Sequence, residues 1–311
     1  MKISNENLKK YIKGVYQFKQ SDDDYLSFYH FNDKQIKYLS FNDFFYIRSK
    51  FSSSITLEAI SNSTSISFEY KLNQVASFDS LDLYIGEELI QSLFIKDLNK
   101  SGKIIFKNLI PGRITIFFPI DCEIQIKNFI CNKDFTPIEE KEKILVLGDS
   151  ITQGYGVRHS SDSYVNVLSR LTNYEFINQG IGGYYFDENI LLPLENILFK
   201  KIIVALGTNQ YQSDDFNERV TAYFQKLNKL YYHLPIILIT PLFRNNAGSD
   251  INLLIKQSNL LVEIASKYKN ILIVNGFELF PHESQYYLDG LHPNSTGAKL
   301  MAKSLIEKGV L

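Results

Sequence analysis

The sequence has no tryptophan and only two cysteines, two methionines and eight prolines among its 311 residues. Two cysteines, Cys122 and Cys131, are too few for a disulfide framework or a zinc site built from cysteine pairs. We therefore expect two reduced, partly buried thiols. The formal net charge of -1 leaves no basic excess, which argues against nucleic acid as a partner.

Long hydrophobic runs are also missing. The first residues, MKISNENLKKYIKG, lack the apolar stretch of a signal peptide, and no later run is long enough to span a bilayer. These features predict a cytoplasmic protein with no membrane partner. Glycine-rich stretches match neither GxGxxG nor a P-loop, and HESQ at 282–285 lacks the second histidine of HExxH. The sequence therefore predicts neither a cofactor nor a metal.

The length favours two domains, at roughly 100–200 residues per domain. In the first half, apolar and β-branched residues alternate with polar ones, as in Ile66, Phe68, Tyr70 and Leu72. Turn signals at KSGK and IPGR separate such runs. This pattern is typical of short antiparallel strands and predicts a β-sandwich or jelly-roll domain over residues 1–138.

The pattern changes beyond the charged segment PIEEKEK at 137–143. Runs that are apolar throughout (KILVL, EFIN, KIIVAL, PIILIT and ILIVN) alternate with helical stretches. The clearest helix follows Asp215, with Phe216, Val220, Tyr223 and Leu227 on one stripe. Residues 139–311 are therefore expected to form an α/β domain with a parallel sheet covered on both faces.

Polar or glycine-rich turns follow these runs. GDS follows the first, NQGIGG the second and GTN the third, and DGLHP precedes the last helix. Ligands bind at the carboxyl ends of the strands in such sheets, so these turns are the candidate site. In order and placement they resemble the four blocks of the SGNH subgroup of GDSL esterases and lipases, over about residues 143 to 311. The resemblance implies a flavodoxin-like three-layer α/β/α hydrolase domain.

The resemblance assigns Ser150 as the nucleophile, and Gly180 and Asn209 as oxyanion-hole residues. His292 is then the base, with Asp289 three residues before it as the orienting acid. The residues themselves agree with these roles. Ser150 lies where a strand gives way to a helix, so its own N–H faces a developing oxyanion, and Asp289 and His292 can share one turn. Each residue also has a structural alternative as a helix cap, turn residue or partner of a loop.

Further residues near these blocks are candidates for substrate binding. Asp149 precedes the nucleophile, and Tyr184, Tyr185 and Phe186 follow Gly183, where they could equally be core residues. Arg244 lies past the fourth strand. The other histidines, His30, His159, His233 and His282, are expected to be structural or surface residues, and His159, in the loop after the nucleophile turn, is the one of them placed best to touch substrate.

SLDLYIGEEL at 80–89 resembles the xDLY signature of sandwich domains that precede some bacterial SGNH hydrolases, including carbohydrate acetylesterases. A packing role and a sugar-binding role both remain open for it.

The sequence lacks the apolar lid expected of an interfacial lipase. We expect a serine esterase acting on short acyl groups, acetyl above all, of a small-molecule or oligosaccharide ester, and we favour a homo-oligomer. Lysophospholipase or thioesterase activity, acyl transfer, and a non-catalytic binding protein are the alternatives.

Overall fold

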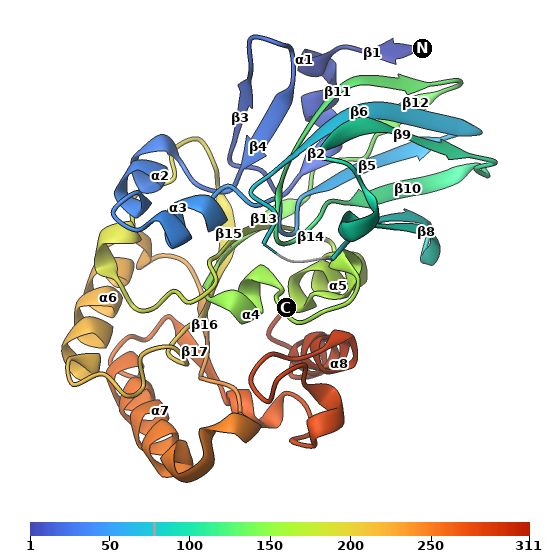
Figure 1. Cartoon of the computed structure of the whole chain (residues 1–311). Coiled ribbons are helices and arrows are strands. Elements are labelled where there is room, and N and C mark those ends of the chain that lie inside the picture. The colour runs from blue at the N-terminus through green and yellow to red at the C-terminus, as the bar shows by residue number, and fades with distance from the viewer. Residues whose placement is uncertain (77–78) are drawn as a thin grey trace.

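A computed structural model describes residues 1–76 and 79–311 of the chain. Figure 1 shows a block of antiparallel strands in the first half, drawn at the top, and a parallel sheet with helices below it. The described first half forms two antiparallel six-stranded sheets, and the described second half forms one parallel five-stranded sheet. The predicted architecture, a β-sandwich followed by an α/β domain, is confirmed.

The first sheet of the sandwich has the order β3-β4-β11-β6-β9, with β1 paired to β11. The second has the order β12-β5-β10-β7-β8, with β2 paired to β5. The strands of the first sheet are β1 (Lys2–Ile3), β3 (Gln17–Gln20), β4 (Leu26–Tyr29), β6 (Ser65–Asn73), β9 (Ser101–Lys107) and β11 (Glu123–Cys131). Those of the second are β2 (Ile12–Lys13), β5 (Thr56–Ser61), β7 (Ser80–Ile85), β8 (Glu88–Phe94), β10 (Gly112–Phe117) and β12 (Phe135–Pro137).

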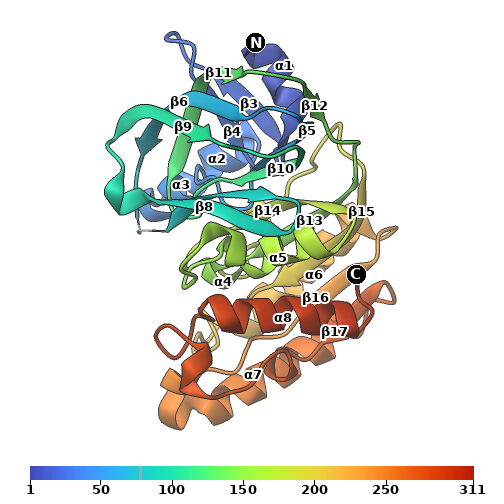
Figure 2. The same cartoon turned by 90° about the vertical axis from the view of Figure 1, so that its right-hand side faces the viewer.

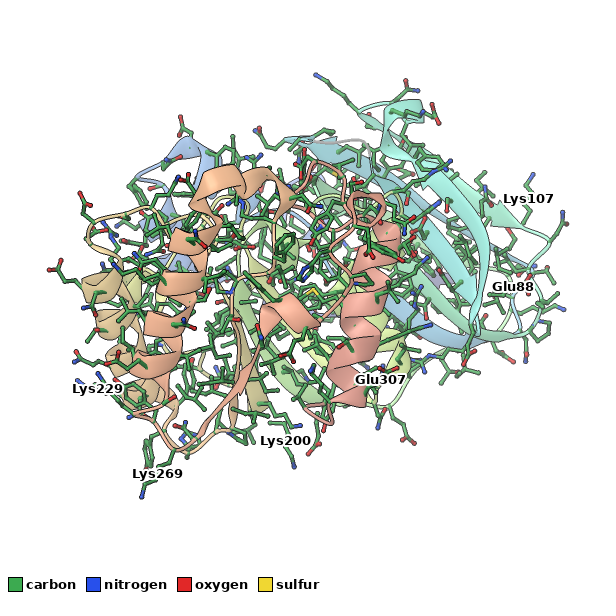
Figure 3. All side chains as sticks on the ribbon, turned by 90° about the horizontal axis from the view of Figure 1, so that it is seen from below. Glu88, Lys107, Lys200, Lys229, Lys269 and Glu307 are labelled. Carbon is green, nitrogen blue, oxygen red and sulfur yellow. The ribbon has the colours of Figure 1, made fainter. Side chains whose placement is uncertain are left out.

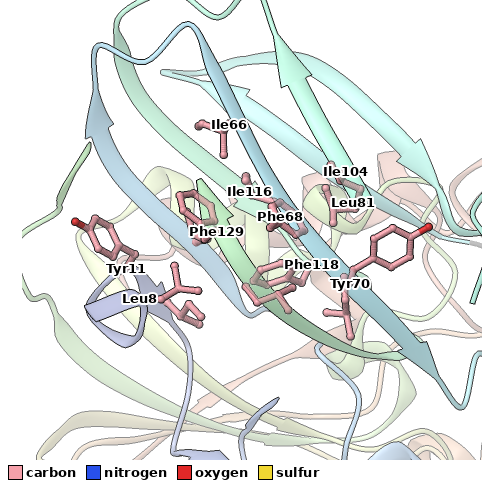
Figure 4. Close-up of a cluster of buried hydrophobic side chains, with 14 of the residues drawn as sticks. Leu8, Tyr11, Ile66, Phe68, Tyr70, Leu81, Ile104, Ile116, Phe118 and Phe129 are labelled. Atoms are coloured by element: carbon pink, nitrogen blue, oxygen red, sulfur yellow. The ribbon is translucent and has the colours of Figure 1, made fainter. Parts of the chain in front are cut away.

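The sandwich core is made by the inward face of these strands (Figure 4). The residues of the alternating run in β6 are buried as predicted, with Ile66 and Phe68 at 0% exposure. They meet Ile116 from the opposite sheet and Leu8 from the short helix α1 (Asn5–Leu8) in one apolar cluster. Cys122 and Cys131 are free and buried in the same cluster, so the expectation of unpaired thiols is confirmed.

The parallel sheet has the order β14-β13-β15-β16-β17. Its strands coincide with the five apolar runs: β13 (Glu142–Gly148), β14 (Tyr174–Gly180), β15 (Phe199–Ala205), β16 (Ile236–Ile239) and β17 (Ile271–Val274). Because side chains alternate along a strand, Leu145 and Leu147 face one side and Ile144 and Val146 the other. Both faces are apolar, so both must be covered.

Helices cover the two faces and complete an α/β/α arrangement. One face carries α6 (Phe216–Tyr231) and α7 (Ile251–Ala265), and the other carries α5 (Tyr164–Leu171) and α8 (Ser295–Glu307). The predicted stripe on α6 is buried. Figure 2 shows α7 and α8 toward the end of the molecule opposite the sandwich. Charged side chains such as Lys200, Lys229 and Glu307 point outward at the edge of this domain in Figure 3.

Part of the first half packs with the second half. Helices α2 (Asp33–Leu39) and α3 (Asp43–Arg48) lie beside α6 in Figure 1. Their residues Ile36, Leu39 and Phe45 belong to the same apolar cluster as α6 and the parallel sheet. We place the domain boundary between the end of β12 at Pro137 and the start of β13 at Glu142, with α2 and α3 as an N-terminal segment that the second domain uses.

Candidate active site

The nucleophile candidate sits on the sharp turn between β13 and the short helix α4 (Ser150–Gln153). Asp149 caps this helix, because its Oδ1 accepts the Ile151 N–H at 3.0 Å. A Cβ at Gly148 would lie 2.1 Å from the Thr152 Oγ1 atom, so only glycine permits the turn. Ser150 is 7% exposed and occupies the first helical position, where backbone N–H groups have no partner within the helix.

Three of the predicted residues come together around Ser150. The Ser150 Oγ lies 2.8 Å from His292 Nε2, and His292 Nδ1 lies 2.8 Å from Asp289 Oδ2. Asp289 Oδ1 also accepts the backbone N–H of His292 at 2.9 Å. The structure therefore contains a continuous hydrogen-bonded chain from serine to histidine to aspartate.

The environment of Asp289 keeps it ionised. Burial alone would raise its pKa, but the hydrogen bonds from His292 and from the Leu291 N–H outweigh burial and hold the pKa of Asp289 below its ordinary value. The loop that carries both residues turns at Gly290, whose φ is +82°. It closes where the Leu288 N–H donates to the His292 carbonyl at 2.8 Å. An ionised carboxylate is the state that orients and stabilises a protonated imidazole.

Gly180 does not occupy the expected oxyanion position. Its N–H donates to Asn178 Oδ1 at 2.9 Å, and a Cβ there would lie 2.4 Å from the Gln153 backbone nitrogen. The assignment of Gly180 as an oxyanion donor is therefore wrong. Gly180 is a close-packing position that lets β14 approach the backbone of α4, and its N–H is already used.

Gly183, three residues later, has the geometry that was expected of Gly180. Its φ is +76°, which favours glycine, and its N–H has no acceptor among the described residues. Asn209 Nδ2 donates to the carbonyl of the next residue, Tyr184, at 2.8 Å. The same loop is tied to the nucleophile turn because the Ile181 N–H donates to the Gly148 carbonyl at 3.1 Å. The run of three glycines in NQGIGG was a usable signal, but it did not show which glycine has a free N–H.

Two residues expected at the substrate are core residues instead. Asp149 is 3% exposed and its carboxylate caps α4, so it does not line the substrate site. Burial raises the pKa of Asp149 to about 7, against the opposing effects of the Ile151 N–H and the Arg244 charge. Tyr184 is also 3% exposed, and its hydroxyl donates to Asp187 Oδ2 at 2.9 Å.

The remaining substrate candidates lie in different places. Tyr185 is half-buried against the Arg219 guanidinium, 5.3 Å from the ring centroid, in a shallow hollow beside α6. Phe186 is completely buried. Arg244 stays near the site, because its Nη1 donates to the carbonyl of Thr208 at 3.2 Å, next to Asn209. Phe186 also contacts a neighbour of Asn209, because its N–H donates to Gln210 Oε1, but its buried ring is part of the core.

Some residues around the site were missed by sequence reasoning. The ring of Tyr155 meets the His292 ring edge-on, with centroids 4.7 Å apart. From α3, Arg48 and Phe44 approach the glycine loop: methyl groups at Gly182 and Gly183 would lie 3.0 and 3.3 Å from them. The position of Tyr155 directly after LGDSITQG offered a signal. Phe44 and Arg48 offered none, because they lie far upstream and only the fold brings them here.

The xDLY segment joins the sandwich to the loop after the nucleophile. Asp82 Oδ2 accepts the Ser161 N–H at 3.0 Å, and the Tyr84 hydroxyl donates to Ser161 Oγ at 3.3 Å. His159 belongs to this contact, because its Nδ1 lies 3.1 Å from the Ser92 hydroxyl and 3.5 Å from Asp82 Oδ1. These contacts give the segment a packing role, and they place His159 at the domain contact, so the expectation that it touches substrate is not supported.

No group of three or more His, Cys, Asp or Glu side chains in residues 1–76 and 79–311 could hold a metal ion. No helix in these ranges is both long enough and apolar enough to cross a bilayer.

Comparison with solved structures identifies several proteins with the same fold. A salicylyl-acyltransferase, SsfX3, from a tetracycline biosynthetic pathway superimposes with a TM-score of 0.82 at 16% identity, covering 100% of this chain and 99% of that one. An acetyl xylan esterase, Est2A, from Butyrivibrio proteoclasticus has a TM-score of 0.65 at 14% identity, with 99% and 97% covered. A family two carbohydrate esterase from Clostridium thermocellum, solved with cellohexaose, has a TM-score of 0.62 at 16% identity, with 82% and 90% covered.

The sequence itself matches no curated protein. It does match a family model, that of the GDSL-like Lipase/Acylhydrolase family, over residues 146–300. This range contains all four turns at which the candidate site residues lie, and it spans the parallel sheet from β13 to α8. The C-terminal half of this chain is therefore a GDSL-like lipase/acylhydrolase domain of the SGNH type.

Proposed function

We propose that this protein is a serine esterase that removes short acyl groups, acetyl above all, from a carbohydrate through an acyl-enzyme. The observation that carries the proposal is the hydrogen-bonded chain from Ser150 Oγ to His292 Nε2 and from His292 Nδ1 to Asp289 Oδ2, 2.8 Å at both steps. This is the geometry that general-base activation of a serine requires. Members of the family are ester hydrolases in general, and the triad supplies the corresponding chemistry.

In the proposed reaction, Ser150 Oγ attacks the ester carbonyl while His292 Nε2 takes its proton. When the tetrahedral intermediate collapses, the bond from the carbonyl carbon to the alcohol oxygen breaks, and His292 returns the proton to that oxygen. Water then attacks the acyl-Ser150 ester, again giving a proton to His292, and the acid leaves as Ser150 is reprotonated. Asp289 holds the imidazole and stabilises its charged form.

Three donors are proposed for the oxyanion: the N–H groups of Ser150 and Gly183 and the side-chain amide of Asn209. The Ser150 N–H is at the start of α4, where the helix dipole strengthens its attraction for a negatively charged oxygen. The Gly183 N–H has no acceptor in the described part of the chain. Asn209 donates one amide hydrogen to the Tyr184 carbonyl, so its second amide hydrogen can bind the oxyanion. Removing one such donor typically costs about 3 kcal/mol of transition-state stabilisation.

The choice of a small acyl group rests on the crowding near Gly183. The Phe44 ring lies against this glycine, and Arg48 covers the face of that ring, with its guanidinium carbon 3.4 Å from the centroid. These two bulky side chains beside the oxyanion position leave more room for an acetyl group than for a long acyl chain. The choice of a carbohydrate is supported by the shared fold with an acetyl xylan esterase and with an esterase that was solved with cellohexaose.

Acyl transfer to an acceptor other than water is the second candidate. The observation in its favour is the likeness over the full chain to a salicylyl-acyltransferase. The same residues would serve, because an acceptor hydroxyl replaces water in the second step. Analysis of products formed from p-nitrophenyl acetate in the presence of sugar acceptors separates the two: free acetate indicates hydrolysis and an acetylated sugar indicates transfer.

The test of the proposed function is hydrolysis of p-nitrophenyl acetate, butyrate and octanoate near pH 8. We expect Ser150→Ala and His292→Ala to lower kcat by several orders of magnitude, as loss of triad members does. His233→Ala is the matched control, because His233 is an exposed histidine outside the site. Full activity in Ser150→Ala would refute the mechanism, and a preference for octanoate would refute the short-chain part of the proposal.

A further inference from the structure

A cavity of about 360 Å³ adjoins the candidate triad. Three parts of the chain line it: the loop Gly154–Arg158 after α4, residues Leu288 and Asn294–Thr296 on both sides of the His292 loop, and Asp79, Ile120 and Asp121 from the sandwich. Its volume falls in the range of small-molecule binding sites. The cavity lies between the two domains, and none of the roles assigned so far uses it.

The cavity lies on the side of His292. The Tyr155 ring lines the cavity and meets the His292 ring edge-on, with the two centroids 4.7 Å apart. A Cβ at Gly156 would lie 3.0 Å from the His292 Cβ, and Leu288 is bonded to the His292 carbonyl. In the proposed reaction His292 gives its proton to the leaving alcohol, so the alcohol part of the ester must lie beside His292. The cavity is the space available there.

A buried carboxyl group in this cavity has an unused oxygen. Asp79 is 5% exposed, and its Oδ2 accepts the Ile120 N–H. Its Oδ1 is buried and has no hydrogen-bond partner among the described residues. A buried polar atom without a partner is costly, typically by about 1–3 kcal/mol. Burial, together with the charge of Asp121, raises the pKa of Asp79 well above its ordinary value, so this carboxyl group can be protonated and can both donate and accept.

The other polar groups of the cavity include donors and acceptors. Arg158 lines it with a guanidinium that lies 5.6 Å from the Phe94 ring centroid. Ser295 and Thr296 contribute hydroxyl groups at the start of α8. An apolar acyl chain would leave Asp79 unsatisfied. Asp121 and Arg158 carry opposite charges in the same cavity, so the lining does not favour a ligand with a net charge of either sign. Ligand hydroxyl groups both donate and accept hydrogen bonds, so they can pair with every one of these cavity groups.

We infer that this cavity binds the alcohol part of the ester as a sugar ring, with one ring hydroxyl hydrogen-bonded to the carboxyl group of Asp79. The inference rests on the proposed function and extends it: the sandwich domain then contributes directly to substrate recognition, through Asp79. Specificity for a hydroxylated alcohol comes from this cavity, whereas the acyl group is selected elsewhere, near Gly183.

The test compares two acetate esters by acetate release: a monoacetylated methyl glucoside and ethyl acetate, whose alcohol is too small to fill the cavity. Thr296→Phe places a ring in the cavity from an exposed position without removing any hydrogen bond of the Thr296 side chain in the described structure. We expect it to lower kcat/KM for the glucoside about tenfold or more, which corresponds to about 1.4 kcal/mol, and to change kcat/KM for ethyl acetate less than twofold. Thr136→Phe, the same change at an exposed position on β12, should change neither.

Asp79→Ala is the second variant and should show the same selective loss if its thermal unfolding shows a folded protein. Equal losses on both esters in Thr296→Phe, or no loss on either, would overturn the inference. A wild-type protein that hydrolyses p-nitrophenyl acetate in a Ser150-dependent way but not the glucoside would overturn the inference and leave the esterase mechanism intact. Absence of any Ser150-dependent hydrolysis would instead refute the proposed function, and the inference with it.

Discussion

The carboxylate of Asp82 accepts the backbone N–H of Ser161 at 3.0 Å and so joins the sandwich strand β7 to the 3-10 turn Ser160–Asp162 that follows the nucleophile helix. Asp82 is completely buried, and three hydroxyl groups also donate to it, those of Ser80, Ser92 and Ser160. One side chain therefore satisfies donors from both domains. The position of the turn after Ser150 depends on the sandwich for this reason.

Asp82→Ala should destabilise the protein severely. The substitution removes the acceptor of three buried donors, from Ser80, Ser160 and Ser161, and of the half-buried Ser92 hydroxyl. Even partial compensation by water leaves an expected loss of about 3 kcal/mol or more. Urea denaturation followed by circular dichroism measures this loss. Asp97→Ala, at an exposed position on the same domain, is the control and should change the unfolding free energy by less than about 0.5 kcal/mol. A similar small effect in both variants would show that Asp82 does not hold the domains together.

Gly180→Ala should destabilise the fold, whereas Gly182→Ala should be tolerated. A methyl group at Gly180 would collide with backbone atoms of Thr152 and Gln153, at 2.7 and 2.4 Å, which cannot move without distorting α4. At Gly182 the nearest atoms belong to the Arg48 side chain, at 3.0 Å, which can shift. We expect a loss of roughly 1–3 kcal/mol for the first and little for the second, measured by thermal unfolding. Equal losses would argue against close packing as the role of Gly180.

Phe44→Ala should broaden the acyl preference. Removing the ring opens space beside Gly183, and each methylene that the new space buries contributes about 0.8 kcal/mol. We expect the ratio of kcat/KM for p-nitrophenyl octanoate to that for acetate to rise roughly tenfold. Phe41→Ala is the control, because Phe41 is a neighbouring exposed phenylalanine that packs on Tyr38 and Phe45. An unchanged ratio in Phe44→Ala would place the acyl group elsewhere.

Asp149 should make the protein less stable as the pH rises. Its pKa is raised by burial from 3.8 to about 7 in the folded state, so between these values the folded protein binds more protons than the unfolded chain. The contribution of Asp149 to the unfolding free energy is complete below pH 3.8 and is lost as the pH rises through 7. The loss is at most about 1.4 kcal/mol per pH unit. Asp149→Asn removes this dependence and keeps an oxygen to cap α4.

The measurement for Asp149 is the urea unfolding free energy at about pH 5 and about pH 8. Relative to wild type, Asp149→Asn should gain stability at the higher pH. Asp214→Asn, an exposed aspartate ahead of α6, is the control and should follow the wild type at both values. A parallel pH dependence of wild type and Asp149→Asn would contradict the raised pKa.

The fold class and all three residues of the candidate triad could be predicted from the sequence. Hydrophobic period is a local property, so the alternation in β6 and the apolar runs of β13 to β17 could be predicted without tertiary information. Ser150, Asp289 and His292 could also be named in advance, because GDS and DGLHP resemble blocks of the SGNH family in order and placement.

Tertiary packing determines which backbone N–H groups, and which side chains from distant parts of the sequence, complete the site. Within NQGIGG, the choice between Gly180 and Gly183 depends on which N–H is already used, here by Asn178, and no local pattern shows that. Phe44 and Asp79 reach the site from the first half of the chain. Such contacts depend on how the two domains pack. Packing depends on the shape of complete surfaces, and a local stretch of sequence does not reveal that shape.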